Sequence, residues 1–327
     1  MRSNTLKISV VFSFYNEMNV IPELLKRTRA VFHELLEKKK IGAYELVFVN
    51  DNSKDGSEAL LRKEIEAHGD IVLVNMSRNF GYEEGVVAGM QIATGDAVVS
   101  MVSDLQDPPE TILEMVDAFL ADEEAEVVYT TRRKRPGEHP LKMLVTNIGY
   151  RVLQYIYTVP IPKNSSDFKL ISRRVIDYVL QFHEEKPFMR GMLGWVGFKN
   201  IQVFYDSEPR FDGRENTKHP VLSRRVMYSW LDRVLISFSD EPLKFILLIG
   251  FLLSVASMCY IFVVLLQKLF GYYVPGWPAL MCAILFIGGI QLMMLGVTGL
   301  YVGAIFRQTR GRPLYIVKEI VRKESDK

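Results

Sequence analysis

The sequence predicts an α/β protein in which a doubly wound, mostly parallel sheet is followed by a hairpin of two transmembrane helices. Before Leu243 the chain alternates short, β-branched runs with helical patterns, the order typical of a doubly wound sheet. After it, two stretches carry no charged residue: Phe245–Leu266, with 22 residues, and Ala279–Phe306, with 28. Each is long enough to cross a hydrocarbon core of ~30 Å as a helix.

Five strands are predicted in the N-terminal part, and polar residues follow most of them. The expected strands cover residues 7–14, 44–49, 71–75, 97–102 and 127–131, with helices between them. Proline stands at the start of two of these helices, at Pro22 and Pro108, where it is favoured. Ligands of open α/β sheets bind beyond the carboxyl ends of the strands, so these polar residues are expected to share one cleft. The same residue types are also ordinary turn formers.

The stretch Ser100–Glu110 is the strongest local signal for a site. An apolar run ends at Ser103 and Asp104, and Pro108 and Pro109 then open a helix. Asp104 and Gln106 therefore project where a ligand would lie, and their oxygen atoms suit Mg²⁺ or Mn²⁺. Asp104 fits a helix cap or a turn equally well.

Composition narrows the possible classes. The chain has 327 residues, 24% of them charged, and a net charge of +2, so bulk charge does not indicate a nucleic-acid partner. Its two cysteines, Cys259 and Cys282, lie in apolar runs and imply no disulfide framework. We expect no signal peptide, because the first residues lead directly into a strand.

Four regions follow from these patterns. Residues 1–220 form the large N-terminal domain, 221–242 an amphipathic helix lying on the membrane, 243–306 the two spans (about 243–266 and 279–306), and 307–327 a basic tail. A second amphipathic stretch, Leu141–Val159, fits an interfacial helix and a core helix equally well. The tail carries seven basic residues against three acidic ones, and the loop Gln267–Pro278 carries one lysine. The positive-inside rule then places the main domain and both termini in the cytoplasm.

Six short motifs resemble glycosyltransferase family 2, and within it the membrane-bound polyprenyl-phosphate glycosyltransferases, such as bactoprenol glucosyltransferases and dolichol-phosphate mannose synthase. The motifs are Tyr15-Asn16-Glu17, Asp51-x-Ser53-x-Asp55-Gly56, Arg78-Asn79-Phe80-Gly81, Asp104-Leu-Gln-Asp-Pro-Pro-Glu110, Asp167-Phe168-Lys169 and Arg210-x-x-Gly213. The run Asp104–Glu110 is the most specific of them. The resemblance implies a GT-A-like fold for the N-terminal domain and extends into the membrane hairpin.

The resemblance also implies roles for individual residues. Asp104 and Asp167 would be catalytic, and Asp104 with Gln106 would hold Mg²⁺ or Mn²⁺. The nucleotide-sugar donor would be bound by Ser13, Tyr15, Glu17, Asp51, Arg78 and Ser103. The acceptor phosphate would be bound by Arg132, Arg135, Lys169, Arg210 and Lys218. The fork of an arginine side chain matches phosphate oxygens, although the run from Arg132 to Arg135 also fits a solvated patch or a patch against anionic lipid.

Several positions depart from the family pattern. Val102 stands where the first Asp of an Asp-x-Asp motif is usual, Lys169 replaces an Arg, and Leu300 stands where a Glu is common. The usual Asp-Asp-Gly-Ser is Asn50-Asp51-Asn52-Ser53, and the segment from Gly213 to Lys218 is longer than usual. These departures leave the donor and the number of metal ions open.

The interpretation is an integral protein of the bacterial inner membrane that makes lipid-linked sugars for cell-envelope glycans. It would transfer a sugar, with inversion, from a nucleotide sugar to a polyprenyl phosphate at the cytoplasmic face. Two alternatives remain: a catalytically degenerate scaffold that binds nucleotide or lipid, which Val102 would allow, and a polysaccharide synthase, whose Gln-x-x-Arg-Trp motif is absent. Gly299-x-x-x-Gly303 is compatible with a homo-oligomer.

Overall fold

The computed structural model describes residues 6–133, 165–182, 184, 187–214, 241–270 and 276–323. The chain divides into two compact units. Unit 1 holds residues 1–222 together with 313–327, and unit 2 holds residues 223–312.

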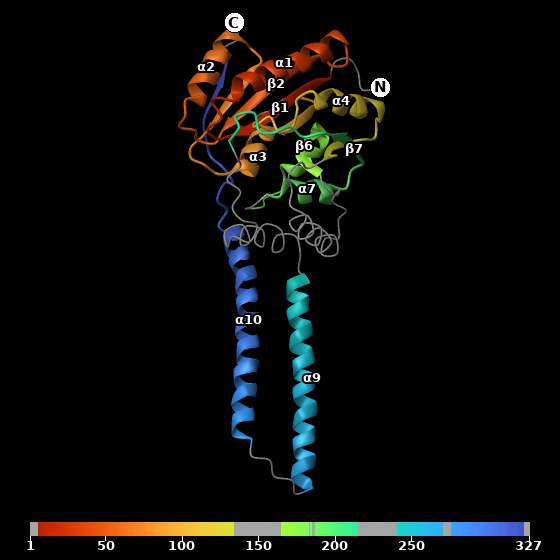
Figure 1. The fold of residues 1–327 in the computed structure, drawn as a ribbon, viewed down its shortest axis with the longest axis vertical. Helices are drawn as coiled ribbons and strands as arrows, with labels where there is room; N and C mark the ends of the chain where they lie inside the picture. The colour runs from red at the N-terminus through yellow and green to blue at the C-terminus, as the bar shows by residue number, and fades with distance from the viewer. Residues whose placement is uncertain are drawn as a thin grey trace. The chain divides into compact units, whose positions relative to one another are not determined.

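Unit 1 is built on one sheet, which in the described residues has the strand order β7-β5-β6-β4-β1-β2-β3-β8 (Figure 1). The strands are β1 (Lys7–Phe14), β2 (Ala43–Asn50), β3 (Ile71–Met76), β4 (Ala97–Val102), β5 (Val127–Arg132), β6 (Ser165–Ser172), β7 (Asn200–Tyr205) and β8 (Val317–Arg322). The pairs β1–β2, β1–β4, β2–β3 and β5–β7 are parallel, whereas β6 runs antiparallel to β4 and β5, and β8 antiparallel to β3. This confirms the doubly wound, mostly parallel sheet and its five predicted strands, to which the structure adds β6, β7 and β8.

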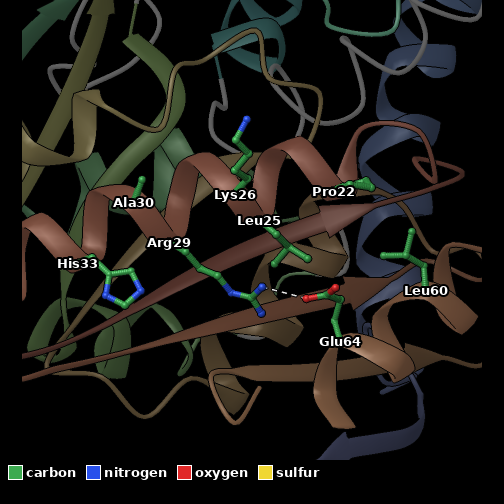
Figure 2. Close-up of a pocket in the computed structure, with 8 residues that line it drawn as sticks. All are labelled: Pro22, Leu25, Lys26, Arg29, Ala30, His33, Leu60 and Glu64. Carbon is green, nitrogen blue, oxygen red and sulfur yellow. Dashed lines mark hydrogen bonds and ion pairs between the residues drawn. The ribbon is translucent and has the colours of Figure 1, made fainter. Parts of the chain in front are cut away.

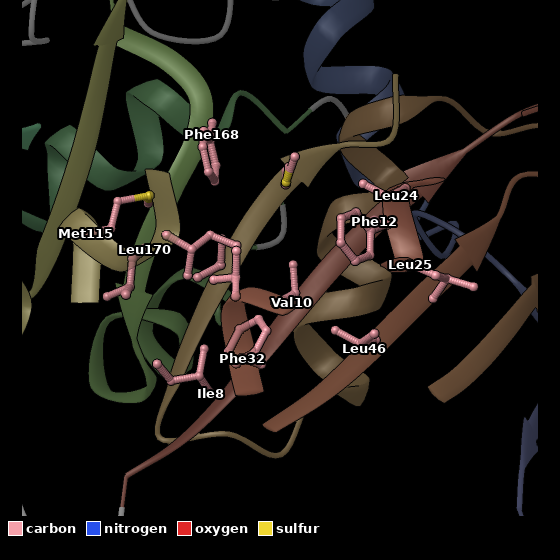
Figure 3. Close-up of a cluster of buried hydrophobic side chains, with 14 of the residues drawn as sticks. Ile8, Val10, Phe12, Leu24, Leu25, Phe32, Leu46, Met115, Phe168 and Leu170 are labelled. Carbon is pink, nitrogen blue, oxygen red and sulfur yellow. The ribbon is translucent and has the colours of Figure 1, made fainter. Parts of the chain in front are cut away.

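The helices of unit 1 cover both faces of this sheet. They are α1 (Ile21–Glu37), α2 (Ser57–Ala67), α3 (Tyr82–Ile92), α4 (Thr111–Ala121), α6 (Arg173–Val179) and α7 (Met189–Val196). Alternate residues of β1, among them Ile8, Val10 and Phe12, are fully buried in one core with side chains of α1 such as Leu24 and Phe32 (Figure 3). The intervening residues of β1 point to the opposite face, as the two-residue period of a strand requires, and there α3 packs.

Two glycines let α3 lie directly on the sheet. A Cβ atom on Gly89 would stand 2.3 Å from Val11 Cγ1 and 3.0 Å from Val49 Cγ2, and one on Gly85 would stand 2.2 Å from Ser13 Oγ. Gly85 and Gly89 are four residues apart and so share one helix face. The close approach fixes the N-terminus of α3 beside the carboxyl ends of β1 and β2.

We expect Gly89→Ala to destabilise the protein by about 1–3 kcal/mol, because the added methyl group overpacks a close helix–sheet contact. Gly69→Ala is the matched control, since its Cβ would meet only Lys323 Cδ at an ordinary 3.7 Å. Thermal unfolding of the purified full chain measures the difference. Equal midpoints for the two variants would show that α3 can move away from the sheet without cost.

The C-terminal segment differs from the prediction of a separate basic tail. Residues Val317–Arg322 form β8, and Leu73 pairs with Val321 across the β3–β8 ladder. Arg62 of α2 forms an ion pair with Glu319, and Ser77 N donates to Ile316 O at 3.0 Å. The short, charged sequence of this strand resembles a solvated tail, so its pairing with β3 could not be recognised locally. Unit 1 therefore includes both the residues that precede unit 2 in the chain and those that follow it.

Unit 2 contains two long helices, α9 (Glu241–Leu269) and α10 (Trp277–Thr309). The predicted spans, about 243–266 and 279–306, fall inside them. By length and composition, one helical segment of the described residues, Phe286–Thr309, could cross a membrane, and a shorter apolar stretch covers Leu248–Tyr260. Two stretches fall outside the described residues: Leu141–Val159, which fits an interfacial helix and a core helix equally well, and 221–242 (as far as residue 240), which was predicted to lie on the membrane surface.

Candidate active site

Glu17 and Asp104, two of the predicted site residues, lie just beyond the carboxyl ends of β1 and β4. These strands are parallel neighbours, with Ser13 opposite Val102, so Glu17 and Asp104 emerge at the same edge of the sheet. Both are buried. This is the position predicted for a ligand of an open α/β sheet.

The loop after β4 is shaped around Asp104. Its Oδ1 accepts a hydrogen bond from the backbone N–H of Gln106 at 3.0 Å. Leu105, between them, has a φ of 59°, a left-handed conformation that is strained for a branched residue. Burial and the nearby Asp107 raise the pKa of Asp104, while the Gln106 N–H, Arg210 and Arg132 oppose that rise.

Arg210 lies among three carboxylates. Its guanidinium forms an ion pair with Glu17, donates to Asp212 Oδ1 at 2.7 Å, and lies 3.8 Å from Asp104 Oδ2. Burial raises the pKa of Glu17, against the effect of Arg210. Among the residues that the structure describes, Glu17 Oε2 has no hydrogen-bond partner, and it lies 3.6 Å from Arg214 Nη2. The resemblance implied that Arg210 binds the acceptor phosphate. In the structure it lies beside Glu17, which was predicted to bind the donor, and Asp104, which was predicted to bind the metal ion.

A second cluster surrounds Asp107, which is fully buried. Arg132 Nη2 donates to Asp107 Oδ1 at 2.8 Å, and the Tyr205 hydroxyl donates to the same oxygen. Arg132 Nε also donates to the Tyr205 hydroxyl oxygen at 2.9 Å. Burial and Asp107 raise the pKa of Tyr205 to about 12, so it stays protonated. The sequence predicted Arg132 but neither of its partners, although Asp107 lies in the most specific motif.

A third cluster joins β6 to α7 through Asp167. Arg190 Nε donates to Asp167 Oδ1 at 2.9 Å, and Lys169 Nζ lies 4.0 Å from the same oxygen. Burial alone would raise the pKa of Asp167, but Arg190 and Lys169 hold it below its usual range. The sequence predicted Asp167 and Lys169 for this site but missed Arg190, which is distant in the chain and in no recognised motif.

Lys169 is the least satisfied ionisable group of this cluster. It is fully buried, and among the described residues its Nζ has no hydrogen-bond partner. Burial lowers the pKa of Lys169 to about 8, although Asp167 counteracts part of the effect. A buried cation of this kind is a ready partner for an anion that enters the site.

Three residues predicted to bind the nucleotide-sugar donor, Asp51, Arg78 and Tyr15, differ in their contacts and burial. Asp51 is buried and accepts from the N–H groups of Phe80 and Gly81, at 2.7 and 3.0 Å, which closes the loop between β3 and α3. Arg78 lies over the ring of Phe80 at 3.9 Å. Tyr15 is exposed at the end of β1.

Two predicted donor residues are packed within the fold, and two acceptor residues cannot be placed. Ser13 is buried against Gly85, and its carbonyl oxygen accepts from the hydroxyl of the buried Ser103 at 3.4 Å. Their side chains thus contribute to packing, because β1 and α3 approach closely there. Arg135 and Lys218 lie outside the described residues.

The acidic residues are compatible with a divalent cation that shares its ligands with a phosphate group. The described residues contain no cluster of three or more His, Cys, Asp or Glu side chains arranged to hold a metal ion. Asp104 and Glu17 offer hard oxygen donors of the kind that Mg²⁺ and Mn²⁺ prefer, and within the described part of the chain Glu17 Oε2 accepts no hydrogen bond. Mg²⁺ is commonly bound by one or two carboxylates plus substrate phosphates.

A groove of about 510 Å³ lies elsewhere, between α1 and α2, and includes Leu25, Arg29, His33 and Glu64 (Figure 2). Arg29 is paired there with Glu64 at 2.9 Å, and with Asp70. No residue predicted for the site lines this groove.

Comparison with known proteins places the chain among sugar-transferring enzymes. The model of the family described as glycosyl transferase family 2 matches residues 9–180. The uncharacterized glycosyltransferase sll0501 of Synechocystis sp. is 38% identical, over 97% of this chain and 96% of the relative. A prophage bactoprenol glucosyl transferase homolog of Escherichia coli is 35% identical, over 96% of this chain and 99% of the relative. The mannosyltransferase PcManGT from Pyrobaculum calidifontis, solved with GDP-Man and Mn²⁺, aligns over 94% of this chain and 88% of its own, with a TM-score of 0.44 and 18% identity.

Proposed function

Because this chain belongs to glycosyltransferase family 2, we propose that it transfers a sugar, with inversion, from a nucleotide sugar to a polyprenyl phosphate. The acceptor class is supported by relatives named bactoprenol glucosyl transferases that are about as long as this chain. We further propose that the protein is anchored in the bacterial inner membrane with its catalytic domain in the cytoplasm.

The observation that carries the proposal is the arrangement of the three clusters along one edge of the sheet. Asp104, with Glu17, lies at the ends of the parallel strands β4 and β1. Asp107, three residues after Asp104, is bonded to Arg132 of β5. Lys169 of β6 pairs in register with both Ser100 of β4 and Tyr129 of β5. An acidic subsite suited to a cation–diphosphate thus adjoins a basic one suited to a phosphate monoester.

The chemistry follows from this arrangement. A lipid phosphate oxygen forms a bond to the anomeric carbon, and the bond from that carbon to the nucleoside diphosphate breaks on the opposite face, which inverts the configuration. A phosphate monoester has its second pKa near ~6 and is largely dianionic at neutral pH, so it needs little help from a base. Asp167, held ionised by Arg190, would orient the acceptor, and Lys169 and Arg132 would bind its charge. A divalent cation at Asp104, with Gln106 beside it, would stabilise the leaving diphosphate.

The proposal is tested with purified full-length protein, undecaprenyl phosphate and a panel of nucleotide sugars. Mass spectrometry should detect a lipid phosphate that has gained one sugar with one of the donors. Absence of a lipid-linked product with the whole panel, while one nucleotide binds tightly, would favour a binding protein instead.

The β3–β8 pairing supports a membrane hairpin. Since the chain leaves unit 1 before α9 and returns to its sheet after α10, unit 2 must cross the membrane an even number of times if it crosses at all. We expect topology reporters inserted at Gly271 and fused after Lys327 to report opposite sides, with Lys327 inside. Reporters on the same side would exclude the hairpin.

Arg210→Ala should raise the KM for lipid phosphate about 10- to 100-fold, the loss expected for one charge-assisted hydrogen bond. Donor affinity should change less, and Mn²⁺ should bind the free enzyme more tightly, because Glu17 and Asp104 lose a neighbouring cation. Calorimetry of nucleotide and Mn²⁺ binding, beside acceptor kinetics, measures all three. An equal loss of donor affinity would assign Arg210 to the donor subsite.

A further inference from the structure

Unit 1 exposes a cluster of aromatic side chains at the corner between α6 and α7. Trp195, on the last turn of α7, is 65% exposed, and Tyr178, on α6, is 46% exposed. The partly buried rings of Phe182 and Phe198 complete the cluster. Large exposed aromatic side chains that are grouped in this way indicate an interaction surface, whereas a single exposed apolar residue does not.

Two ring pairs make up this surface, named here the α6–α7 patch (Tyr178, Phe182, Trp195 and Phe198). Phe182 and Trp195 meet edge to face, with ring centroids 5.2 Å apart, and Tyr178 and Phe198 lie 5.8 Å apart. Gly197, with a φ of 73°, ends α7 and turns Phe198 back toward α6. Arg174, which is largely exposed, lies 4.7 Å from the centre of the Phe198 ring and forms an ion pair with Glu126 at 3.6 Å.

We propose that the α6–α7 patch contacts the lipid headgroup layer and holds the acceptor end of the active site at the depth of the lipid phosphate. Trp and Tyr concentrate at membrane–water interfaces, where an apolar ring and a polar tip are both accommodated. Although it is paired with Glu126, the guanidinium of Arg174 is 62% exposed, so it can also contact anionic headgroups. Four side chains are too few for a stable protein interface of standard size, which uses about 20–30 residues on each side.

The position of α7 relates this surface to the site. The same short helix carries Arg190, bonded to Asp167, in its first turn and Trp195 in its last. Five residues of a helix span about 7.5 Å along its axis. A membrane contact at Trp195 would therefore keep Asp167 and Lys169 within about one headgroup layer of the bilayer, where the phosphate of a polyprenyl acceptor also lies. This second step depends on the proposed function, whereas the membrane contact itself does not.

Tryptophan fluorescence tests the contact directly. The chain has three tryptophans, so Trp230→Phe with Trp277→Phe leaves Trp195 as the sole emitter. The full chain is reconstituted in vesicles of phosphatidylcholine and phosphatidylglycerol that carry bromine at shallow or deep positions of the acyl chains. Trp195 should be quenched by the shallow bromines more than by the deep ones, and lipid should protect it from acrylamide. A Glu66→Trp reporter on α2, in a background without other tryptophans, should not be quenched by lipid.

Two results would overturn the proposal. One is the absence of quenching by either brominated lipid; the other is protection of Trp195 that requires a second copy of the chain, tested in nanodiscs that hold one copy each. Kinetics test the step that depends on the function. Trp195→Ser should raise the KM for long-chain polyprenyl phosphate in vesicles but not for a short, water-soluble phosphate acceptor, and Trp195→Phe should restore it. If quenching occurs and no acceptor is glycosylated, the proposed function fails and the membrane contact stands.

Discussion

Sugar transfer is expected to fall about 100- to 1,000-fold when Asp104 is replaced by asparagine, the range seen when one electrostatic group is removed from an active site. The substitution is nearly isosteric and keeps an oxygen that can accept from the N–H of Gln106. It removes the charge that Asp104 would offer to a cation on the leaving diphosphate. Steady-state turnover with a saturating donor measures the effect.

The matched control for Asp104→Asn is Asp117→Asn, the same chemical change on the exposed face of α4, where the carboxylate forms an ion pair with Lys40. It should leave turnover unchanged, and both variants should keep the parent unfolding midpoint. Val102 stands where the first Asp of an Asp-x-Asp motif is usual and cannot coordinate a cation, so Asp104 is the one carboxylate of that three-residue motif. Full activity of Asp104→Asn, or of the parent protein in EDTA, would contradict a metal-assisted departure of the diphosphate.

Lys169→Met should stabilise the fold and impair catalysis at the same time. Burial lowers the pKa of Lys169 to about 8, so keeping this side chain charged costs folding free energy at pH 7. An apolar side chain of similar length is expected to stabilise by about 1–3 kcal/mol, while Arg190 still pairs with Asp167. The loss of a cation for the acceptor phosphate should raise the KM for that substrate about 10- to 100-fold. Such opposition between stability and activity is characteristic of functional residues.

The dependence of this gain on pH has a definite sign. The pKa of Lys169 is about 8 in the folded state and near 10.4 when unfolded, so the unfolded chain binds more protons between these values. The charged Lys169 side chain therefore lowers the free energy of unfolding below about pH 8, and this destabilisation disappears as the pH rises toward 10.4. The advantage of Lys169→Met should shrink over that window in thermal unfolding. Lys63→Met, at an exposed site on α2, should show neither the gain nor the slope.

The parts of the fold that sequence analysis predicted correctly are those with a local pattern. The strands β1 to β5 are continuous apolar runs, and Asp104 stands where one of them stops, so strand and loop are both readable. β6 and β8 were missed because neither is a continuous apolar run: Lys169 interrupts β6, and Lys318 and Glu319 interrupt β8. Each pairs antiparallel with a strand that is distant in the chain. For the same reason the partners Arg190 and Tyr205 could not be assigned before the strands were placed.

The packing of Ser13 marks a second limit. The resemblance to the family implies a donor contact for Ser13, which stays a prediction; side chains alternate along a strand, and that of Ser13 is directed at Gly85 of α3. Only the close approach of that helix reveals the difference. Arg210 illustrates the same point, because its three carboxylate partners come from separate parts of the chain.

The central claim is that a lipid phosphate oxygen displaces a nucleoside diphosphate from the anomeric carbon of a sugar with inversion. The most direct measurement is a nuclear magnetic resonance spectrum of the purified lipid product, made from a nucleotide sugar labelled with ¹³C at the anomeric carbon. We expect coupling between that carbon and the phosphorus of the lipid phosphate, and an anomeric configuration opposite to that of the donor. A retained configuration, or a labelled carbon without coupling to phosphorus, would contradict it.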